Sequence, residues 1–120
     1  MPRDARAYLA DILESCDAIA YALEGLDLDA YKANRLVRSS VEREFIIIGE
    51  AAAALSRIAP DLFVSISHAR RIVDFRNRLT HEYPNVSDVI VWGIAKRDVP
   101  VLRDECADLM RALGEVGESS

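Results

Sequence analysis

Apolar residues recur at steps of three and four along most of this chain, and that spacing constrains the fold more than any other feature. In the first 24 residues they mark one face of a helix: Ala5, Tyr8, Leu9, Ile12, Leu13, Cys16, Ile19, Ala20 and Leu23. A second long pattern of the same kind covers residues 37–59. No alternating pattern long enough to indicate a strand is present. The sequence therefore predicts an all-α protein.

Helix boundaries follow from the stop and start signals. The first helix should run from about Asp4 to Glu24 and stop at Gly25, with an acidic link over residues 26–29. The second should end before Pro60. Its middle, FIIIGEAAAAL, is apolar around much of its circumference, and Gly49 with four alanines permits close approach by other helices. We therefore expect a central helix that is buried on more than one side.

The second half of the chain predicts at least two further helices. Residues 60–66 should form a loop, with Ser67 as the N-cap of a helix that ends before Pro84. Residues 86–97 and 99–113 form a last helical stretch, in which Pro100 either opens a new helix or kinks a continuous one. Gly114 and Gly117 mark a frayed tail. An antiparallel bundle of four to five helices is the expected architecture.

Composition limits the class of protein. A chain of 120 residues with 51% hydrophobic content is expected to form one domain over residues 1–120. Cys16 and Cys106 are the only cysteines, which favours reduced core thiols and a cytoplasmic location. Charges interrupt the first helix, so it is not expected to be a secretion signal or a membrane span.

Charge is divided unevenly along the chain. The net charge is -5, yet residues 32–97 hold 11 Lys or Arg against 7 acids. This middle region could attract phosphate. From charge alone, an ordinary mixed and solvated helix surface remains the stronger interpretation.

The most informative segment is RNRLTHEY, residues 76–83. At about 100° per residue, Arg76, Asn77, Thr80 and Tyr83 share an arc with the apolar residues upstream of them, and His81 lies at its margin. In one interpretation Arg76 pairs with an acid of the central helix, His81 caps its own helix and Tyr83 fills a gap. In the other, the groups line a cleft in which Arg76 holds a phosphate. Geometry alone favours the first.

RNA cleavage suits the second interpretation. A 2'-hydroxyl needs a base, the leaving 5'-oxygen needs an acid, and the transition state needs a cation. His81 could act as base or acid, and Arg76 could stabilise the phosphate charge. Because each chain offers one histidine here, a two-fold dimer would supply the second.

The spacing of arginine, four residues, histidine, one residue and tyrosine resembles the signature of the HepT-like toxins of the HEPN superfamily. The segments ARAYLADILESCDAI, IIIGEAAAAL and VIVWGIAKRDVPVL also resemble that group, so the likeness covers nearly the whole chain. It implies a homodimeric helical bundle and metal-independent endoribonuclease activity on RNA. It also implies a nucleotidyltransferase antitoxin of the MntA type as partner.

When the roles of the family's motif residues are carried over by position, the resemblance implies a role for each residue of the motif here. Arg76 and His81 become the catalytic residues and Asn77 a supporting polar group. Tyr83 becomes the hydroxyl that the partner adenylylates from ATP. Cleavage itself is expected to need no cofactor. Two alternatives stay open: a non-catalytic helical module that docks a nucleotidyltransferase, and a purely structural dimer.

Other residues carry weaker expectations. Glu50, a carboxylate in an apolar segment, should have a partner and could orient Arg76 or form a structural salt bridge. His68 is expected to be an ordinary exposed or capping histidine. Trp92 and its apolar neighbours Val89, Ile90 and Ile94 are expected to be core or interface anchors. The spacing of histidines and acids predicts no metal site.

Overall fold

The computed structural model describes residues 3–81 and 86–119, the last five of these by their backbone alone. The described residues form six helices and no strand: α1 (Ala5–Leu23), α2 (Leu28–Ala33), α3 (Arg35–Ile58), α4 (Pro60–Ser65), α5 (Ala69–His81) and α6 (Asp88–Ser119). The all-α prediction is confirmed. Two of the six helices are short, which explains why the sequence indicated only four or five.

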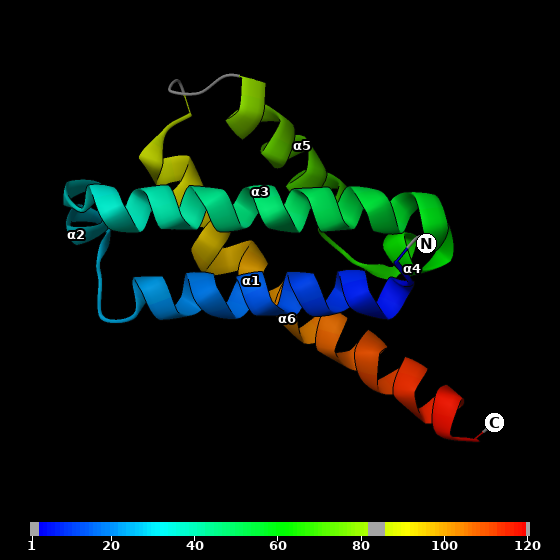
Figure 1. Ribbon diagram of the computed structural model, residues 1–120. Coiled ribbons are helices and arrows are strands. Elements are labelled where there is room, and N and C mark those ends of the chain that lie inside the picture. Colours follow the sequence, from blue (N-terminus) through cyan, green and yellow to red (C-terminus); the bar gives the residue numbers. More distant parts are fainter. Residues whose placement is uncertain (1–2, 82–85, 120) are drawn as a thin grey trace.

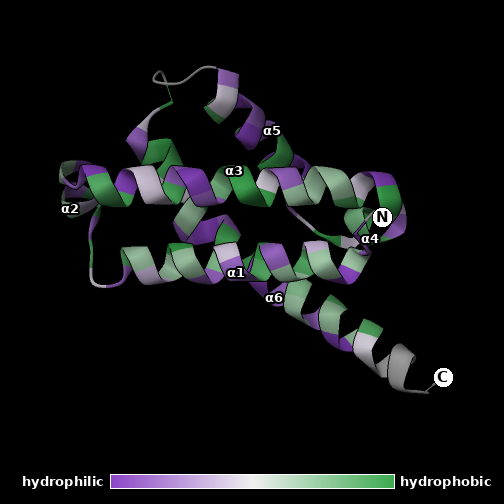
Figure 2. Ribbon diagram, viewed as in Figure 1, coloured by the Kyte–Doolittle hydropathy of each residue, from purple (hydrophilic) through white to green (hydrophobic). Residues whose placement is uncertain are grey.

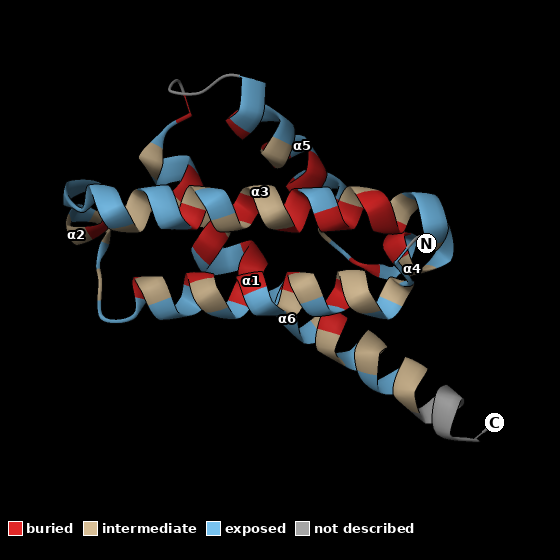
Figure 3. Ribbon diagram, in the orientation of Figure 1, coloured by how far each residue is buried: buried red, intermediate tan, exposed pale blue. Residues whose placement is uncertain are grey.

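The long helix α3 lies at the centre of the molecule. It runs antiparallel to α1 on one flank and packs against α5 on the other, while α6 crosses behind (Figure 1). Apolar and polar residues alternate around both α1 and α3 (Figure 2), and buried residues recur along each (Figure 3). Phe45 of α3 is fully buried and meets Phe75 of α5 edge-on, with ring centroids 5.2 Å apart. The predicted central helix is confirmed.

Caps fix the starts of the first three helices. The side chain of Asp4 accepts a hydrogen bond from the Ala7 amide at the start of α1, and Asp27 and Asn34 cap α2 and α3 in the same way. Gly25 follows α1 with a φ of 78°, a left-handed conformation that glycine adopts without strain. The boundaries predicted for the first helix are therefore correct to within a residue at each end.

The linkers predicted around the central helix were partly wrong. The predicted acidic link is interrupted at Leu28, where α2 begins. Residues 60–65 form α4 rather than a loop. Pro60 suits the first position of a helix, because its fixed φ is helical and it has no amide hydrogen to satisfy there. Each short helix buries one aromatic ring, Tyr31 in α2 and Phe63 in α4. Tertiary burial thus stabilises helices too short to form alone.

Ser67 is not an N-cap. Its amide and its hydroxyl both donate to the carboxylate of Glu105 in α6, at 3.1 and 3.0 Å, and α5 begins at Ala69. The serine therefore joins the start of α5 to a distant helix, which no local pattern indicates.

Pro100 lies inside one continuous helix and does not open a new one. The proline leaves the carbonyl of Lys96 without its intrahelical donor, and both residues are exposed, where water can replace it. The helix also continues through Gly114 and Gly117 to Ser119, so the frayed tail was wrong. Among the described helices, none has the length and apolar content to cross a membrane.

The two cysteines are buried free thiols, as predicted. Cys16 comes from α1 and Cys106 from α6, and the two side chains are 1% and 0% exposed. Burial raises the pKa of Cys106 to about 12 and raises that of Cys16 as well, because a thiolate is poorly solvated in the core.

Candidate functional site

Arg76 lies where α5 crosses the central helix. A Cβ added to Gly49 of α3 would stand 2.2 Å from the Cβ of Arg76 and 2.5 Å from its Cγ. Only a glycine allows the two helices to approach this closely, so Gly49 sets the position of the arginine. Arg76 is half-buried, which confirms that it extends the apolar face of its helix.

The guanidinium of Arg76 lacks a partner for one of its nitrogens. Its Nε is buried and makes no hydrogen bond to any described residue. Within the same part of the chain, no ion pair joins Arg76 to Glu42, Glu44 or Glu50. The interpretation that paired it with an acid of α3 is therefore wrong. A buried cationic donor without a partner is costly, and a phosphate oxygen is a suitable acceptor for it.

His81 is the last residue of α5 and is exposed. At about 100° per residue it shares a side of α5 with Asp74 and Asn77, which are exposed too, so it does not lie at the edge of the buried face. Asn77 and Thr80 are exposed as well, which corrects their assignment to the inward arc. The Thr80 hydroxyl bonds back to the carbonyls of Arg76 and Asn77, both at 3.1 Å. Tyr83 and Pro84 lie outside the described residues.

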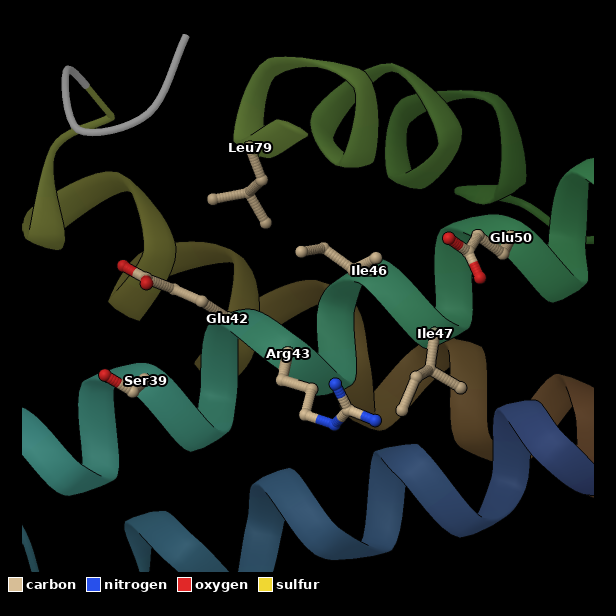
Figure 4. Close-up of a pocket in the computed structure, with 7 residues that line it drawn as sticks. All are labelled: Ser39, Glu42, Arg43, Ile46, Ile47, Glu50 and Leu79. Atoms are coloured by element: carbon tan, nitrogen blue, oxygen red, sulfur yellow. The ribbon is translucent and has the colours of Figure 1, made fainter. Parts of the chain in front are cut away.

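A trough of about 460 Å³ opens beside this crossing, on the exposed side of α3. Its walls combine isoleucines with charged groups, and Leu79 closes it on the α5 side (Figure 4); the lining residues are Ser39, Glu42, Arg43, Ile46, Ile47, Glu50 and Leu79. Glu50 is exposed and has no hydrogen bond or ion pair to the described residues, so the partner expected for it is absent there.

Glu42, at one end of the trough, has a raised pKa. Partial burial is the main cause, and the nearby carboxylate of Asp88 adds to it, while Arg38 acts in the opposite direction. Arg38 also pairs with Asp88 at 3.9 Å, which joins the start of α3 to the start of α6.

A family model described as ribonuclease HepT-like matches residues 12–109, from within α1 to well inside α6. The chain belongs to the HepT-like ribonuclease family. The resemblance drawn from the sequence motif is thereby confirmed, and the all-helical bundle fits the HEPN type of fold.

Curated relatives resemble this HepT-like chain over most of their length. A protein of Methanocaldococcus jannaschii named "Putative RNase" is 32% identical, with 86% of this chain and 94% of that protein covered. A second of the same organism and the same printed description is 28% identical over 98% and 97% of the two chains. The "Probable ribonuclease HepT" of Thermococcus cleftensis is 26% identical over 92% of this chain and 100% of that one. No solved structure matches.

The other residues singled out in this HepT-like chain lie away from the crossing. His68 is half-buried, and its carbonyl accepts the Ile72 amide in the first turn of α5, an ordinary helix-start role. Trp92 packs against Tyr31 with ring centroids 5.5 Å apart, whereas Val89 and Ile90 are exposed rather than part of the core. In the described ranges, no three metal-ligating side chains gather at one place.

The sequence analysis singled out Glu50 but missed the other residues of α3 that line the trough with it. Ser39, Arg43, Ile46 and Glu50 follow steps of four, three and four, so they form a second stripe on the central helix, distinct from its core face. That spacing was readable in the sequence. The stripe is hard to recognise because residues 45–48 are all apolar, and such a run does not show which of its isoleucines face inward.

Proposed function

We propose that this chain is a metal-independent endoribonuclease, the toxin of a toxin–antitoxin system, and that it cuts RNA at a site completed by two copies. The observation that carries the proposal is the crossing of α5 over α3. There the buried Nε of Arg76 has no partner among the described residues, and the exposed His81 lies on the same helix. Membership in the HepT-like family supports the ribonuclease activity.

The chemistry follows from the residue types. A neutral His81 takes the proton of the 2'-hydroxyl as its oxygen attacks the phosphorus, and a protonated His81 from the second copy protonates the leaving 5'-oxygen. The new bond joins phosphorus to the 2'-oxygen and the bond to the 5'-oxygen breaks, which leaves a cyclic phosphate and a 5'-hydroxyl. Arg76 stabilises the charge on the phosphate oxygens, and Asn77 offers a further donor. This scheme uses no metal.

We further propose that Tyr83 is the control point. A nucleotidyltransferase antitoxin of the MntA type would transfer AMP from ATP to its hydroxyl and release pyrophosphate. Tyr83 follows the end of α5 by two residues. An attached AMP would place an anion within reach of Arg76 and His81, where it would compete with the RNA phosphate.

Cleavage of RNA by the purified chain in the presence of a chelator tests the enzyme. Wild type should cut RNA, and Arg76→Ala and His81→Ala should each lower the rate by at least about 100-fold. His68→Ala, the other histidine, should retain the activity. Mass spectrometry must first show that the sample carries no AMP.

An unmodified wild type that leaves every RNA intact would overturn the ribonuclease proposal. If the same sample still accepts AMP on Tyr83 from the nucleotidyltransferase and ATP, the non-catalytic docking module becomes the better account. If instead only the melting temperature responds to changes at Arg76 and His81, the motif is structural.

A further inference from the structure

The central helix has one face that no other described helix covers. α1 lies along one flank of α3 and α5 along the other (Figure 1). The trough opens on the face of α3 between them (Figure 4). Ile46 and Ile47 lie at the middle of this open stripe and are only partly buried. Arg43 precedes them and Glu50 follows them.

Arg43 and Glu50 are charges of opposite sign without partners on their own chain. Both are exposed, and neither makes a hydrogen bond or an ion pair to the described residues. Seven residues separate them, which is close to two turns, so the side chains project in nearly the same direction about 10 Å apart. Their midpoint falls between Ile46 and Ile47, which is also the midpoint of α3.

We propose that a second copy of this chain docks on this stripe, with its α3 antiparallel to the first. The two-fold axis would pass between Ile46 and Ile47. Arg43 of each protomer would then face Glu50 of the other, and the four isoleucines would gather at the axis. A parallel arrangement would instead oppose Arg43 to Arg43 and Glu50 to Glu50, so the charges themselves select the antiparallel register.

This interface deepens the two-copy site of the proposed function and rests on it. An axis at right angles to α3, lying between the two helices, leaves both α5 helices on the same flank of the pair. Arg76 stands against Gly49, and Leu79 borders the trough, so the motif of each copy lies near the axis. The pairing therefore brings both copies of Arg76 and His81 to one cleft.

The oligomeric state of charge variants tests the interface without any RNA. Analytical ultracentrifugation should show wild type as a dimer. Arg43→Glu opposes acid to acid and Glu50→Arg opposes base to base, so each should raise the dimer dissociation constant by at least about 100-fold. Arg6→Glu on α1 makes the same charge change beside Gly114 of α6, away from the stripe, and should stay dimeric.

Two further samples test the register and the contact between the charged positions. The double variant Arg43→Glu/Glu50→Arg restores opposite charges and should dimerise again. An equimolar mixture of the two single variants should form a heterodimer, because one chain then carries an acid at both positions and the other a base at both. Opposite charges therefore meet at each end of the paired stripes. Each single variant changes only exposed side chains, and formation of the heterodimer would also show that both are folded.

A monomeric wild type, or single variants that remain dimeric, would overturn this interface. Failure of the double variant to dimerise would overturn the antiparallel register, and failure of the folded single variants to form the heterodimer would overturn the contact between positions 43 and 50 of the two copies. The outcome is separate from that of the enzyme: a chain that pairs as described but never cuts RNA keeps the interface and loses the proposed function. If instead the chain cuts RNA while both single variants stay dimeric, the proposed function stands and the interface is overturned.

Discussion

Replacing Gly49 by alanine should separate α5 from α3 at Arg76. The added Cβ would lie 2.2 Å from the Cβ of Arg76, where ordinary contact begins at 3.4 Å, so the gap must open by about 1 Å (3.4 less 2.2). The obstacle is the root of the arginine side chain, with its Cα 3.6 Å away, so rotamer change cannot relieve the contact and the helix itself must shift.

Two opposing contributions determine how Gly49→Ala changes the free energy of unfolding. Overpacking of this kind costs about 1–3 kcal/mol, and the short contacts place it near the upper end. Alanine in a helix recovers up to about 1 kcal/mol over glycine. We expect a net loss of about 2 kcal/mol in the free energy of unfolding.

Gly93→Ala provides the matched control. It makes the same substitution inside α6, where the nearest atoms to the new Cβ all belong to the guanidinium of Arg97, the far end of a flexible side chain, with Nη2 at 3.0 Å. That variant should gain up to about 1 kcal/mol. At one protein concentration, the melting temperatures of the two variants should differ by on the order of 10 °C.

The same shift of α5 should also lower the rate of RNA cleavage. A displacement of about 1 Å at a catalytic group can cost on the order of 100-fold in rate. Gly49→Ala should therefore lose RNA cleavage well below its melting temperature, while Gly93→Ala keeps it. If Gly49→Ala melts at or above the temperature of wild type, Gly49 does not set the helix separation and the reasoning is refuted.

Four further side chains give predictions. Tyr31→Phe removes a buried hydroxyl with no partner among the described residues and should leave the free energy of unfolding unchanged or raise it by about 1 kcal/mol; a larger loss in urea denaturation would show that the hydroxyl is bonded. The raised pKa of Glu42 means that its charged form destabilises the fold, so stability is lost as pH rises from the unfolded pKa through the folded one. Glu42→Gln should therefore melt higher than wild type at pH 7 and equally at pH 4, and a constant difference would contradict this. Cys16 and Cys106, with raised pKa values, should resist alkylation at pH 8 until the protein unfolds, and rapid labelling of the native protein would disprove their burial.

Local sequence patterns were enough to predict the long helices. The three- and four-residue steps placed α1 and α3, and Gly25 and Pro60 bounded them. These signals work because a helix of several turns repeats its apolar face many times, and one misplaced residue does not hide the period.

The same patterns could not reveal the short helices or the contacts that join distant segments. α2 and α4 are held by the burial of Tyr31 and Phe63, which depends on helices far along the chain. Ser67 looked like a cap and instead bonds to Glu105, 38 residues away. A serine offers the same hydroxyl to either partner, and only the packing of α6 decides which one is near.

The sequence by itself determined that this chain is a helical bundle, that its family is HepT-like, and that Arg76 and His81 lie on one helix five residues apart. Only the tertiary structure decided what surrounds them. It set Arg76 against Gly49 with a nitrogen left unbonded among the described residues, and it left the charged stripe of α3 open between α1 and α5. The physical reason is that helical periodicity fixes the direction of a side chain on its own helix, whereas its neighbours depend on how closely two helices can approach, and that distance is set by residues such as Gly49.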